Sequence, residues 1–489
     1  MFGRRSRAKS VGIVRPPILQ ASSPPVGPLL EIVSRKDVGV GMAGHSQSSA
    51  VEEAAITHCE YIASYNWLDR SKPSIAIPGR APPAWTPPIT PVKLSLDSGT
   101  YYRDPNAARA PVFPLEPAVQ AVLTEARELD TQSIDLFTCS SAFGSLLRFV
   151  RGVDKPFRFF VEIIGHTAFF IRHENSPTEL IPDVKGYGHT FPEAYTTWDS
   201  EVKGSTSHQR LLQYSFGGLS CIVRFQCDGY LKSKAPKDTK RGTNHGADGI
   251  SAILDSMDSM NVVASQDRMD LQAGTLNVEI AGRRIPQTAV FELKTRSVRN
   301  ERNVFEEELP RFWTAQIDNF ILARHESGAF NDIQVMDISE RVKRWEQESQ
   351  DDLRSLVWIL RKIIAVANAR NDKKLEVQCK SLEALELREQ DSSEHNALPH
   401  YLKSQWLGNK LSRQKDYEVK APFEGVGEPI GNEALKESEF HFYNPDLRDE
   451  ESENRFYNSD WESEESEESE KDFTACSADS CGYCGHCSY

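Results

Sequence analysis

TAVFELKT (residues 288–295) combines an apolar run with two ionisable side chains, Glu292 and Lys294, on either side of Leu293. Successive side chains of a β-strand point to opposite faces, so a strand here places Glu292 and Lys294 on one face and Leu293 on the other. Two charged side chains that share a face inside an apolar run need a partner or a ligand. The stretch therefore predicts a strand that carries a functional site.

Other apolar runs surround this stretch and predict further elements. Gly, Pro, Asn and Asp bound the predicted strands, which lie at 157–164, 167–173, 219–228, 276–280 and 288–295. Helical spacing of apolar residues predicts helices at 115–128, 304–326 and 351–370. Helices that flank a group of strands indicate an α+β domain with a central mixed sheet at residues 111–375. We expect the strands at 157–164, 219–228 and 288–295 to belong to that one sheet.

A divalent-metal site explains the polar face of the strand at 288–295. Asp228 ends the predicted strand at 219–228, and Asp228 and Glu292 offer hard oxygen ligands suited to Mg²⁺ or Mn²⁺. Such an ion polarises a phosphate and lowers the pKa of an attacking water molecule, which Lys294 could orient. The alternative is an ordinary Glu–Lys pair on a half-exposed strand.

Several motifs around these residues resemble the decapping exoribonucleases of the DXO type. The motifs are VRFQCDGY (223–230), VFELKT (290–295) and LPRFWTAQIDNFIL (309–322), within a resemblance that spans about residues 135–340. That family has a PD-(D/E)XK-like nuclease fold, removes faulty 5′ caps from RNA and degrades RNA with a 5′-monophosphate. The resemblance implies catalytic roles for Asp228, Glu292, Lys294 and Gln316. It also implies that Glu193, in GHTFPE (188–193), is a third ligand of the metal.

The sequence departs from the family pattern at four places. Gln226 stands where the family has a metal-linked glutamate, and Pro192 is an extra residue before Glu193. The family's RNA-contacting arginine is missing near Cys139-Ser140-Ser141, and the spacing from Trp313 to Gln316 is one residue longer than in the family. The leading hypothesis is a metal-dependent RNA 5′-end decapping pyrophosphohydrolase and 5′–3′ exoribonuclease. A non-catalytic protein that binds RNA or another protein on the same fold is the alternative, and a DNA-cleaving nuclease is a third.

Arginines near the predicted site are candidates for phosphate binding. Arg296 and Arg299 follow Lys294, and Arg311 lies on the helix that carries Gln316. A solvated, charged turn is the alternative for Arg296 and Arg299. His208 precedes the strand at 219–228, and a structural histidine is the favoured interpretation, with an acid–base residue as the alternative.

The net charge of −14 is a property of the C-terminal part. Residues 433–472 hold sixteen Asp or Glu and four Lys or Arg, which leaves about −2 for the rest of the chain. Like charges repel and little apolar area is present, so a disordered acidic linker is predicted at 433–472. The remaining predicted parts are a Pro-rich, largely irregular region at 1–110, an inserted loop at 231–274, a peripheral region at 376–432 and a Cys-rich end at 473–489.

Four cysteines lie within the last fourteen residues, namely Cys476, Cys481, Cys484 and Cys487. Four thiolates at this spacing predict one Zn²⁺ site, and a flexible thiol-rich tail is the alternative. Because it follows an acidic linker, this end is a candidate contact site for a protein partner.

No run of about 18 apolar residues is present, so a membrane span is not expected. The other five cysteines are scattered along the chain, which favours a reducing, intracellular compartment over a secreted disulfide framework. The nucleus or the cytoplasm is expected. Five Arg or Lys and no acid in the first 30 residues make the mitochondrion the alternative.

Overall fold

The computed structural model describes residues 25–38, 53–79, 81–181, 184, 186–202, 204–235, 276–300, 303–390 and 396–408. All of them lie within Met1–Lys410, which belongs to one of the two compact units of the chain. The predicted loop at 231–274 is described only as far as residue 235. The acidic linker at 433–472 and the zinc site at Cys476, Cys481, Cys484 and Cys487 lie outside the described residues and stay predictions.

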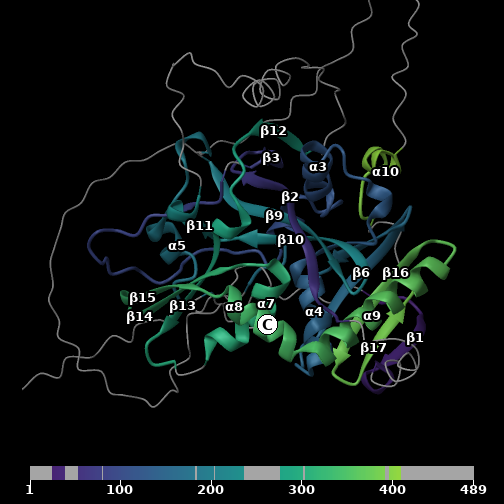
Figure 1. The fold of residues 1–489 in the computed structure, drawn as a ribbon. Helices are drawn as coiled ribbons and strands as arrows, with labels where there is room; N and C mark the ends of the chain where they lie inside the picture. The colour runs from purple at the N-terminus through teal and green to yellow at the C-terminus, as the bar shows by residue number, and fades with distance from the viewer. Residues whose placement is uncertain are drawn as a thin grey trace, which may run out of the picture. The chain divides into compact units, whose positions relative to one another are not determined.

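Eleven strands of the described residues form a large mixed sheet (Figure 1). β10 (Leu219–Cys227) runs parallel to β5 (Leu136–Cys139) and antiparallel to β9 (Ser205–Phe216). In spatial order, the strands are β1 (Leu29–Ser34), β17 (Ala384–Arg388), β16 (Lys374–Ser381), β6 (Phe157–Ile164), β7 (Thr167–Arg172), β5, β10, β9, β2 (Ile56–Leu68), β3 (Ser74–Pro78) and β12 (Asn277–Ala281).

A second, small sheet holds the stretch from which the sequence analysis started. Among the described residues it contains β15 (Ala329–Asp337), β14 (Asn319–Glu326), β13 (Val290–Ser297), β11 (Gly229–Tyr230), β4 (Ala84–Trp85) and β8 (Thr196–Thr197). β13 pairs in parallel with β14 and antiparallel with β11. The α+β class with helices on mixed sheets is confirmed. The expectation that β6, β10 and β13 share one sheet is wrong, because β13 lies in the small sheet.

The chain passes from the large sheet to the small one at Asp228. β10 ends at Cys227 and β11 begins at Gly229, which approaches β13 closely. A Cβ atom on residue 229 would lie 2.3 Å from the ring of Phe291 and 2.7 Å from the carbonyl oxygen of Pro83. Only glycine fits there, since both neighbours are parts of packed strands or loops. Asp228 is thereby held at the junction, beside β13.

Helices cover both faces of the large sheet (Figure 1). α4 (Ser140–Arg151) and α9 (Gln350–Ala369) pack on one face, in the same apolar cluster as Val223 of β10. α3 (Glu116–Glu125) and α10 (His400–Trp406) pack on the other face with Ile222, the preceding residue of the strand. The remaining helices are α2 (Pro105–Arg109), α5 (Thr190–Tyr195), α7 (Val304–Ala315) and α8 (Ser339–Glu348).

The helix predicted at 304–326 is shorter in the structure. α7 ends at Ala315, where Gln316 adopts a left-handed backbone conformation with a φ of 48°. Residues 319–326 form β14, in the middle of the small sheet. Its continuous apolar run, Phe320 to Ala323, is typical of a strand buried on both faces and also satisfies a helical pattern, so periodicity alone could not separate the two.

The structure also differs from the predicted organisation at both ends of the domain. The region 1–110, predicted to be largely irregular, contributes β1, β2 and β3 to the large sheet and β4 to the small one. The region 376–432, predicted to be peripheral, contributes most of β16, all of β17 and the core helix α10. β3 and β4 are short strands among prolines, which concealed them, whereas β2 has 13 residues and lies outside the Pro-rich stretch.

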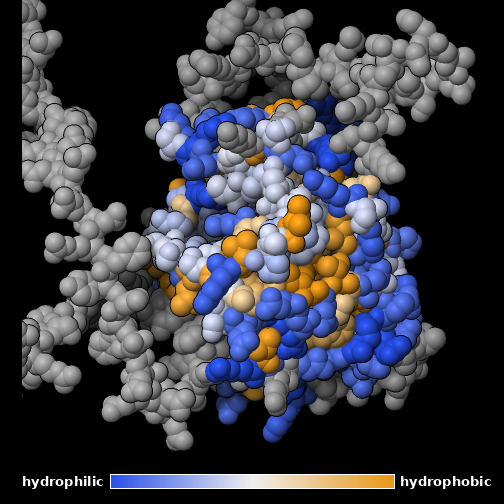
Figure 2. Space-filling view, turned by 90° about the vertical axis from the view of Figure 1, so that its left-hand side faces the viewer, coloured by the Kyte–Doolittle hydropathy of each residue, from blue (hydrophilic) through white to orange (hydrophobic). Residues whose placement is uncertain are grey.

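The side of the molecule that carries β13 to β15 and α5 shows an apolar area bordered by hydrophilic surface (Figure 2). Exposed large apolar side chains in this part of the chain include Ile89, Leu96 and Val335. None of the helices that the structure describes is both long and apolar enough to cross a membrane.

Candidate active site

β13 carries the two ionisable side chains that the sequence places on one face. Glu292 and Lys294 are fully buried, with 0% of each residue exposed. On the opposite face, Phe291 and Leu293 pack in an aromatic cluster with Phe191 of α5. The alternation along β13 therefore separates an apolar face from a charged one, and the charged one is closed off from bulk water.

α7 supplies the counterions for this charged face. Lys294 Nζ lies 3.0 Å from Glu308 Oε1, and Arg311 Nη2 lies 2.6 Å from Glu292 Oε1. Glu308 and Arg311 are three residues apart in the helix, so they lie on the same face of it. Asp228 completes the group at the sheet junction. We call Asp228, Glu292, Lys294, Glu308 and Arg311 the buried charge cluster.

Asp228 is fixed by the strand that it approaches. Its Oδ2 accepts a hydrogen bond of 2.9 Å from the backbone N–H of Leu293, between the two charged residues of β13. Burial raises the pKa of Asp228, and Arg311 and this hydrogen bond act in the opposite direction. The result is a carboxyl group held beside Glu292 on the charged face of β13.

The carboxyl oxygens of Glu292 are poorly satisfied by the protein. Burial raises its pKa well above the usual range; Arg311 lowers it and the nearby Asp228 raises it further. Although Arg311 is close, neither oxygen of Glu292 has a partner with hydrogen-bond geometry among the described residues. Buried, unsatisfied carboxylate oxygens suit a hard divalent cation, which commonly uses one or two carboxylates together with water and substrate oxygens. Asp228 and Glu292 fit such an ion.

Glu193, the predicted third ligand, lies elsewhere. It is exposed on α5, since the buried residues of that helix are Phe191 and Tyr195, and a side chain midway between them points away from the core. Within the described residues, no group of three or more His, Cys, Asp and Glu side chains is arranged to hold a metal ion. The predicted ligand set of Glu193, Asp228 and Glu292 is therefore not formed, and only its last two members meet.

Gln316 is also outside the buried charge cluster. It caps the C-terminus of α7, where its Nε2 donates a hydrogen bond of 2.6 Å to the carbonyl oxygen of Trp313. Eight residues of helix separate it from Glu308, a distance of about 12 Å along the axis. The side chain of Gln316 thus helps to end the helix, and its role in positioning water or phosphate stays a prediction.

The predicted phosphate-binding arginines divide into two groups. Arg311 belongs to the buried charge cluster. Arg296 is buried near the end of β13, about 13 Å from Glu292 at the rise of a strand, and Arg299 is exposed in the turn that follows. Neither Arg296 nor Arg299 lines the cavities described next, which favours the charged-turn interpretation for Arg299.

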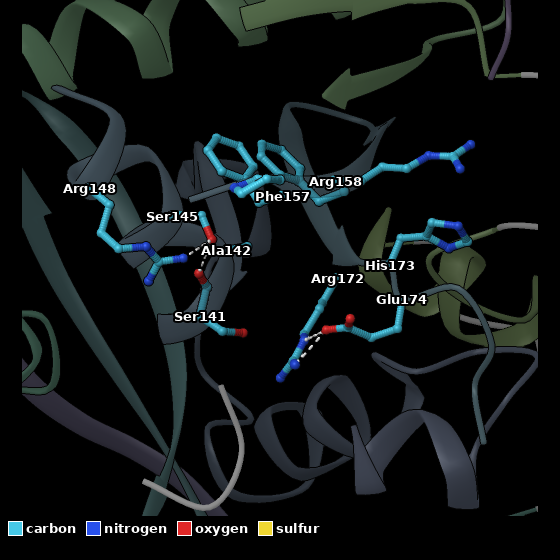
Figure 3. Close-up of a pocket in the computed structure, with 11 residues that line it drawn as sticks. Ser141, Ala142, Ser145, Arg148, Phe157, Arg158, Arg172, His173 and Glu174 are labelled. Atoms are coloured by element: carbon cyan, nitrogen blue, oxygen red, sulfur yellow. Dashed lines mark hydrogen bonds and ion pairs between the residues drawn. The ribbon is translucent and has the colours of Figure 1, made fainter. Parts of the chain in front are cut away.

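A cavity of about 70 Å³ lies between the start of α4 and the strands β6 and β7 (Figure 3). Three of its lining side chains are arginines, Arg148, Arg158 and Arg172. Arg172 donates a hydrogen bond of 2.7 Å to Glu174, the cavity's one carboxylate among the described residues. We call this space the β6–β7 cavity.

Two smaller cavities also lie along α4, one at its first residues and one from its first residue to its last turn. The β10 cavity, of about 30 Å³, shares Ser141 and Arg172 with the β6–β7 cavity and is also lined by Arg224 and Gln226. The α4–α7 cavity, of about 20 Å³, shares Arg148 with the β6–β7 cavity and is also lined by Arg311. The remaining lining residues include Asp104, Ser140 and Arg151.

Arginines outnumber carboxylates along the three cavities. Six arginines and two carboxylates line them, counted over the described residues: Arg148, Arg151, Arg158, Arg172, Arg224 and Arg311 against Asp104 and Glu174. Arg158 is paired with Glu376 and Arg311 with Glu292, so the excess of positive charge is two. The start of α4 adds backbone N–H groups that have no partner within the helix, and Cys139 provides no side-chain cap for them. Such a lining is suited to anions.

The buried charge cluster is connected to two of these cavities. Arg311 belongs to both the cluster and the α4–α7 cavity, and Gln226 of the β10 cavity is two residues from Asp228. The other four members of the cluster line none of the three cavities, so Arg311 is the contact between them. Sequence reasoning missed Glu308, although its spacing to Arg311 within a predicted helix was a usable signal. It also missed Arg172 and Arg224, for which no local signal exists.

His208, the candidate acid–base residue, has a structural role. It is buried, and its Nδ1 lies 2.6 Å from Asn66 Oδ1. Burial lowers the pKa of His208 well below its usual value, and Arg210 adds to the effect. There is therefore a pH range in which His208 is neutral in the folded protein and protonated in the unfolded chain.

This difference predicts a dependence of stability on pH. Above pH 6.5, neither state binds the proton, and below it the stability falls by up to about 1.4 kcal/mol per pH unit from this group. In His208→Gln the amide replaces the ring and this part of the slope is lost. Urea unfolding of both proteins between about pH 5 and pH 7 measures it, and equal slopes would contradict the prediction.

Residues 43–406 match the model of a family described as a domain of unknown function, DUF8563. The chain belongs to this family. The matched range reaches from before β2 to the end of α10, so it includes both sheets and the buried charge cluster. No curated protein matches the sequence.

Solved structures with a similar arrangement are distant in sequence. S. pombe Rai1 in complex with 3′-FADP shares 11% identity, over 74% of this chain and 100% of that one, with a TM-score of 0.45. Scheffersomyces stipitis Rai1 in complex with (3′-NADP)⁺ and calcium shares 12%, over 73% and 97%, with a TM-score of 0.43. K. lactis Dxo1 in complex with manganese shares 8%, over 76% and 99%, with a TM-score of 0.41.

Proposed function

We propose that this protein is a hydrolase that acts on the 5′ ends of RNA with the help of a divalent cation. The observation that carries the proposal is the buried charge cluster, in which Asp228, Glu292 and Lys294 share one face of the small sheet and Arg311 joins them to an arginine-lined cavity. Carboxylates beside a lysine serve the hydrolysis of a phosphate ester, and arginines beside them serve to bind the phosphates.

The chemistry follows from the positions of the side chains. Asp228 and Glu292 would hold the cation, which polarises a phosphoryl oxygen and lowers the pKa of a water molecule. Attack of that water on phosphorus forms one P–O bond and breaks another, and negative charge develops on the phosphoryl oxygens. Lys294 stabilises this charge, and Glu308 keeps Lys294 pointed along the charged face of β13.

The polymer and its end are inferred from two separate features. Phosphate binding in the β10 cavity, through Arg172 and Arg224, suits a terminal phosphate next to the buried charge cluster. The resemblance of the motifs at 223–230, 290–295 and 309–322 to decapping exoribonucleases supports RNA as the polymer.

The test is incubation of the full-length protein with labelled RNA that bears a 5′-monophosphate, a 5′-triphosphate, a guanosine cap or an NAD cap. DNA with a 5′-monophosphate and the same base sequence is assayed in parallel, and each reaction is run with and without Mn²⁺. Release of nucleotide or cap from RNA that requires Mn²⁺ is expected. Cleavage of the DNA alone would replace RNA with DNA as substrate, and no release from any substrate would overturn hydrolysis.

Because Gln226 is neutral, we expect weak Mn²⁺ binding and slow hydrolysis in the wild type, and we expect Gln226→Glu to improve both. Gln226 lines the β10 cavity, and its Oε1 accepts a long hydrogen bond of 3.4 Å from Gln209. Gln226→Glu adds a carboxylate two residues from Asp228, so Mn²⁺ should bind on the order of tenfold more tightly and hydrolysis should accelerate. Calorimetric titration with Mn²⁺ measures the affinity. The matched variant Gln209→Glu, on the neighbouring strand, should give a smaller effect.

RNA-end binding without hydrolysis is the second candidate. Two features favour this candidate. Gln226 lacks the negative charge of the family's glutamate, and Arg311 already pairs with the carboxylate of Glu292. In that case 5′-phosphorylated RNA would bind with a strong dependence on salt, and neither the wild type nor Gln226→Glu would release any product.

A further inference from the structure

Arg311 lies where a divalent cation would meet Glu292. Its guanidinium is 2.6 Å from Glu292 Oε1, and Glu292 lines none of the three cavities, whereas Arg311 lines the α4–α7 cavity. The side chain of Arg311 is 13% exposed and that of Glu292 is 1% exposed. An ion that enters from the α4–α7 cavity therefore has to pass the guanidinium of Arg311 to reach the carboxylate of Glu292.

An arginine at this position competes with a divalent cation. Both are positively charged, so they repel each other, and both need the same oxygen of Glu292. The three carboxylates and two cations of the buried charge cluster have a formal charge of −1. If a divalent cation replaces Arg311, the cluster becomes neutral; if Arg311 stays, its formal charge becomes +1. Burial makes the second arrangement the costly one.

The lining of the α4–α7 cavity favours an anion beside Arg311. Arg148 and Arg151 line this cavity with Arg311, and no Asp or Glu of the described residues does. Ser140, the first residue of α4, lies on the same cavity, so backbone N–H groups add to the attraction for an anion. A phosphate here could take a bidentate contact from the guanidinium of Arg311.

We propose that Arg311 is a gate that couples the two ligands, an inference that rests on the proposed function. The guanidinium holds the cation position beside Glu292 until a phosphate group in the α4–α7 cavity draws it away. Asp228 and Glu292 then bind a divalent cation, so the cation binds well only together with a phosphorylated ligand. Arg311 is thus a positioning residue that keeps the site closed in the absence of substrate.

The experiment measures the affinity of the full-length protein for Mn²⁺ by electron paramagnetic resonance of the free ion, with and without saturating adenosine 5′-monophosphate. The control is Glu292→Gln with the nucleotide, in which any Mn²⁺ that is bound is held by the nucleotide and not by the carboxylate of Glu292. In the wild type, we expect the nucleotide to tighten Mn²⁺ binding on the order of 10-fold or more. Arg311→Gln should bind Mn²⁺ tightly without nucleotide, and its coupling factor should fall.

Two further variants test whether the effect belongs to this arginine. Arg311→Lys keeps the positive charge, so its affinity for Mn²⁺ without nucleotide should stay near the wild-type value. This variant still tests the gate if Arg311→Gln folds poorly. Arg151→Gln removes an equal charge from the same cavity, where Arg151 stacks over Trp345 at 5.7 Å. It should weaken nucleotide binding without raising nucleotide-free Mn²⁺ affinity.

Equal nucleotide-free affinities for Mn²⁺ in the wild type and Arg311→Gln would overturn the gate, and so would an equal rise in Arg151→Gln. Neither result bears on hydrolysis, which is measured separately as Mn²⁺-dependent release of product from RNA. Absence of Mn²⁺ binding in every variant, with or without nucleotide, would overturn the gate and the cation-dependent function together.

Discussion

Replacement of Glu292 by glutamine lowers the rate of RNA hydrolysis at least about 100-fold, because it removes the charge of a cation ligand at the reacting phosphate. The substitution preserves shape. Glutamine keeps the volume of Glu292 but leaves the guanidinium of Arg311 without its carboxylate partner. The free energy of unfolding is therefore measured together with the rate, so that a loss of folding is told apart from a loss of chemistry. Single-turnover release of labelled product in Mn²⁺ measures the rate.

Glu306→Gln is the matched control for this substitution. Glu306 lies in the first turn of α7 and forms an exposed ion pair with Arg341. The same change of charge is made there on the helix that supplies Glu308 and Arg311, and it should leave the rate unchanged within a factor of about 2. If Glu292→Gln retained the wild-type rate, the chemistry would have to lie outside the buried charge cluster.

Replacement of Trp406 by alanine destabilises the protein by about 3–5 kcal/mol. Trp406 is fully buried at the end of α10, and its ring centroid lies 5.7 Å from that of Phe137 and 5.3 Å from that of Phe169. Its Nε1 donates a hydrogen bond of 2.9 Å to Thr167 Oγ1, which the substitution also removes. Chemical unfolding monitored by circular dichroism measures the loss.

The neighbouring residue provides the control. Leu407 is 40% exposed, and Leu407→Ala should cost less than about 0.5 kcal/mol. If Trp406→Ala were equally mild, α10 would not be part of the core of the large sheet. The region 376–432 would then be as peripheral as its composition suggested.

Much of the local structure could be predicted from the sequence. The strand at 157–164 coincides with β6. The strand at 219–228 differs from β10 by one residue at one end, and the helix at 351–370 differs from α9 by one residue at each end. These elements have a clear period of apolar residues and polar or turn-forming boundaries, which are short-range properties. Prediction failed at 304–326, where one apolar run suits a helix and a strand equally well, and a left-handed Gln316 decided between them.

The candidate site was predictable where its residues are close in sequence. Glu292 and Lys294 share a face because alternate residues of any strand do, and the same argument applied to a helix pairs Glu308 with Arg311. Motif resemblance was less reliable for Glu193 and Gln316. Each lies on a predicted or matched segment, but the buried positions of α5 and the end of α7 turn their side chains to other uses.

By itself the sequence determined an α+β protein with a charged strand face at Glu292 and Lys294, because the repeats of strands and helices depend on neighbours a few residues apart. Only the tertiary structure decided that Asp228 joins two sheets, that α7 closes the charged face, and that arginines of α4, β7 and β10 line neighbouring cavities along α4. The residues of such contacts lie tens of residues apart. They are brought together by the packing of whole elements around shared cores, for which a single sequence contains no local pattern.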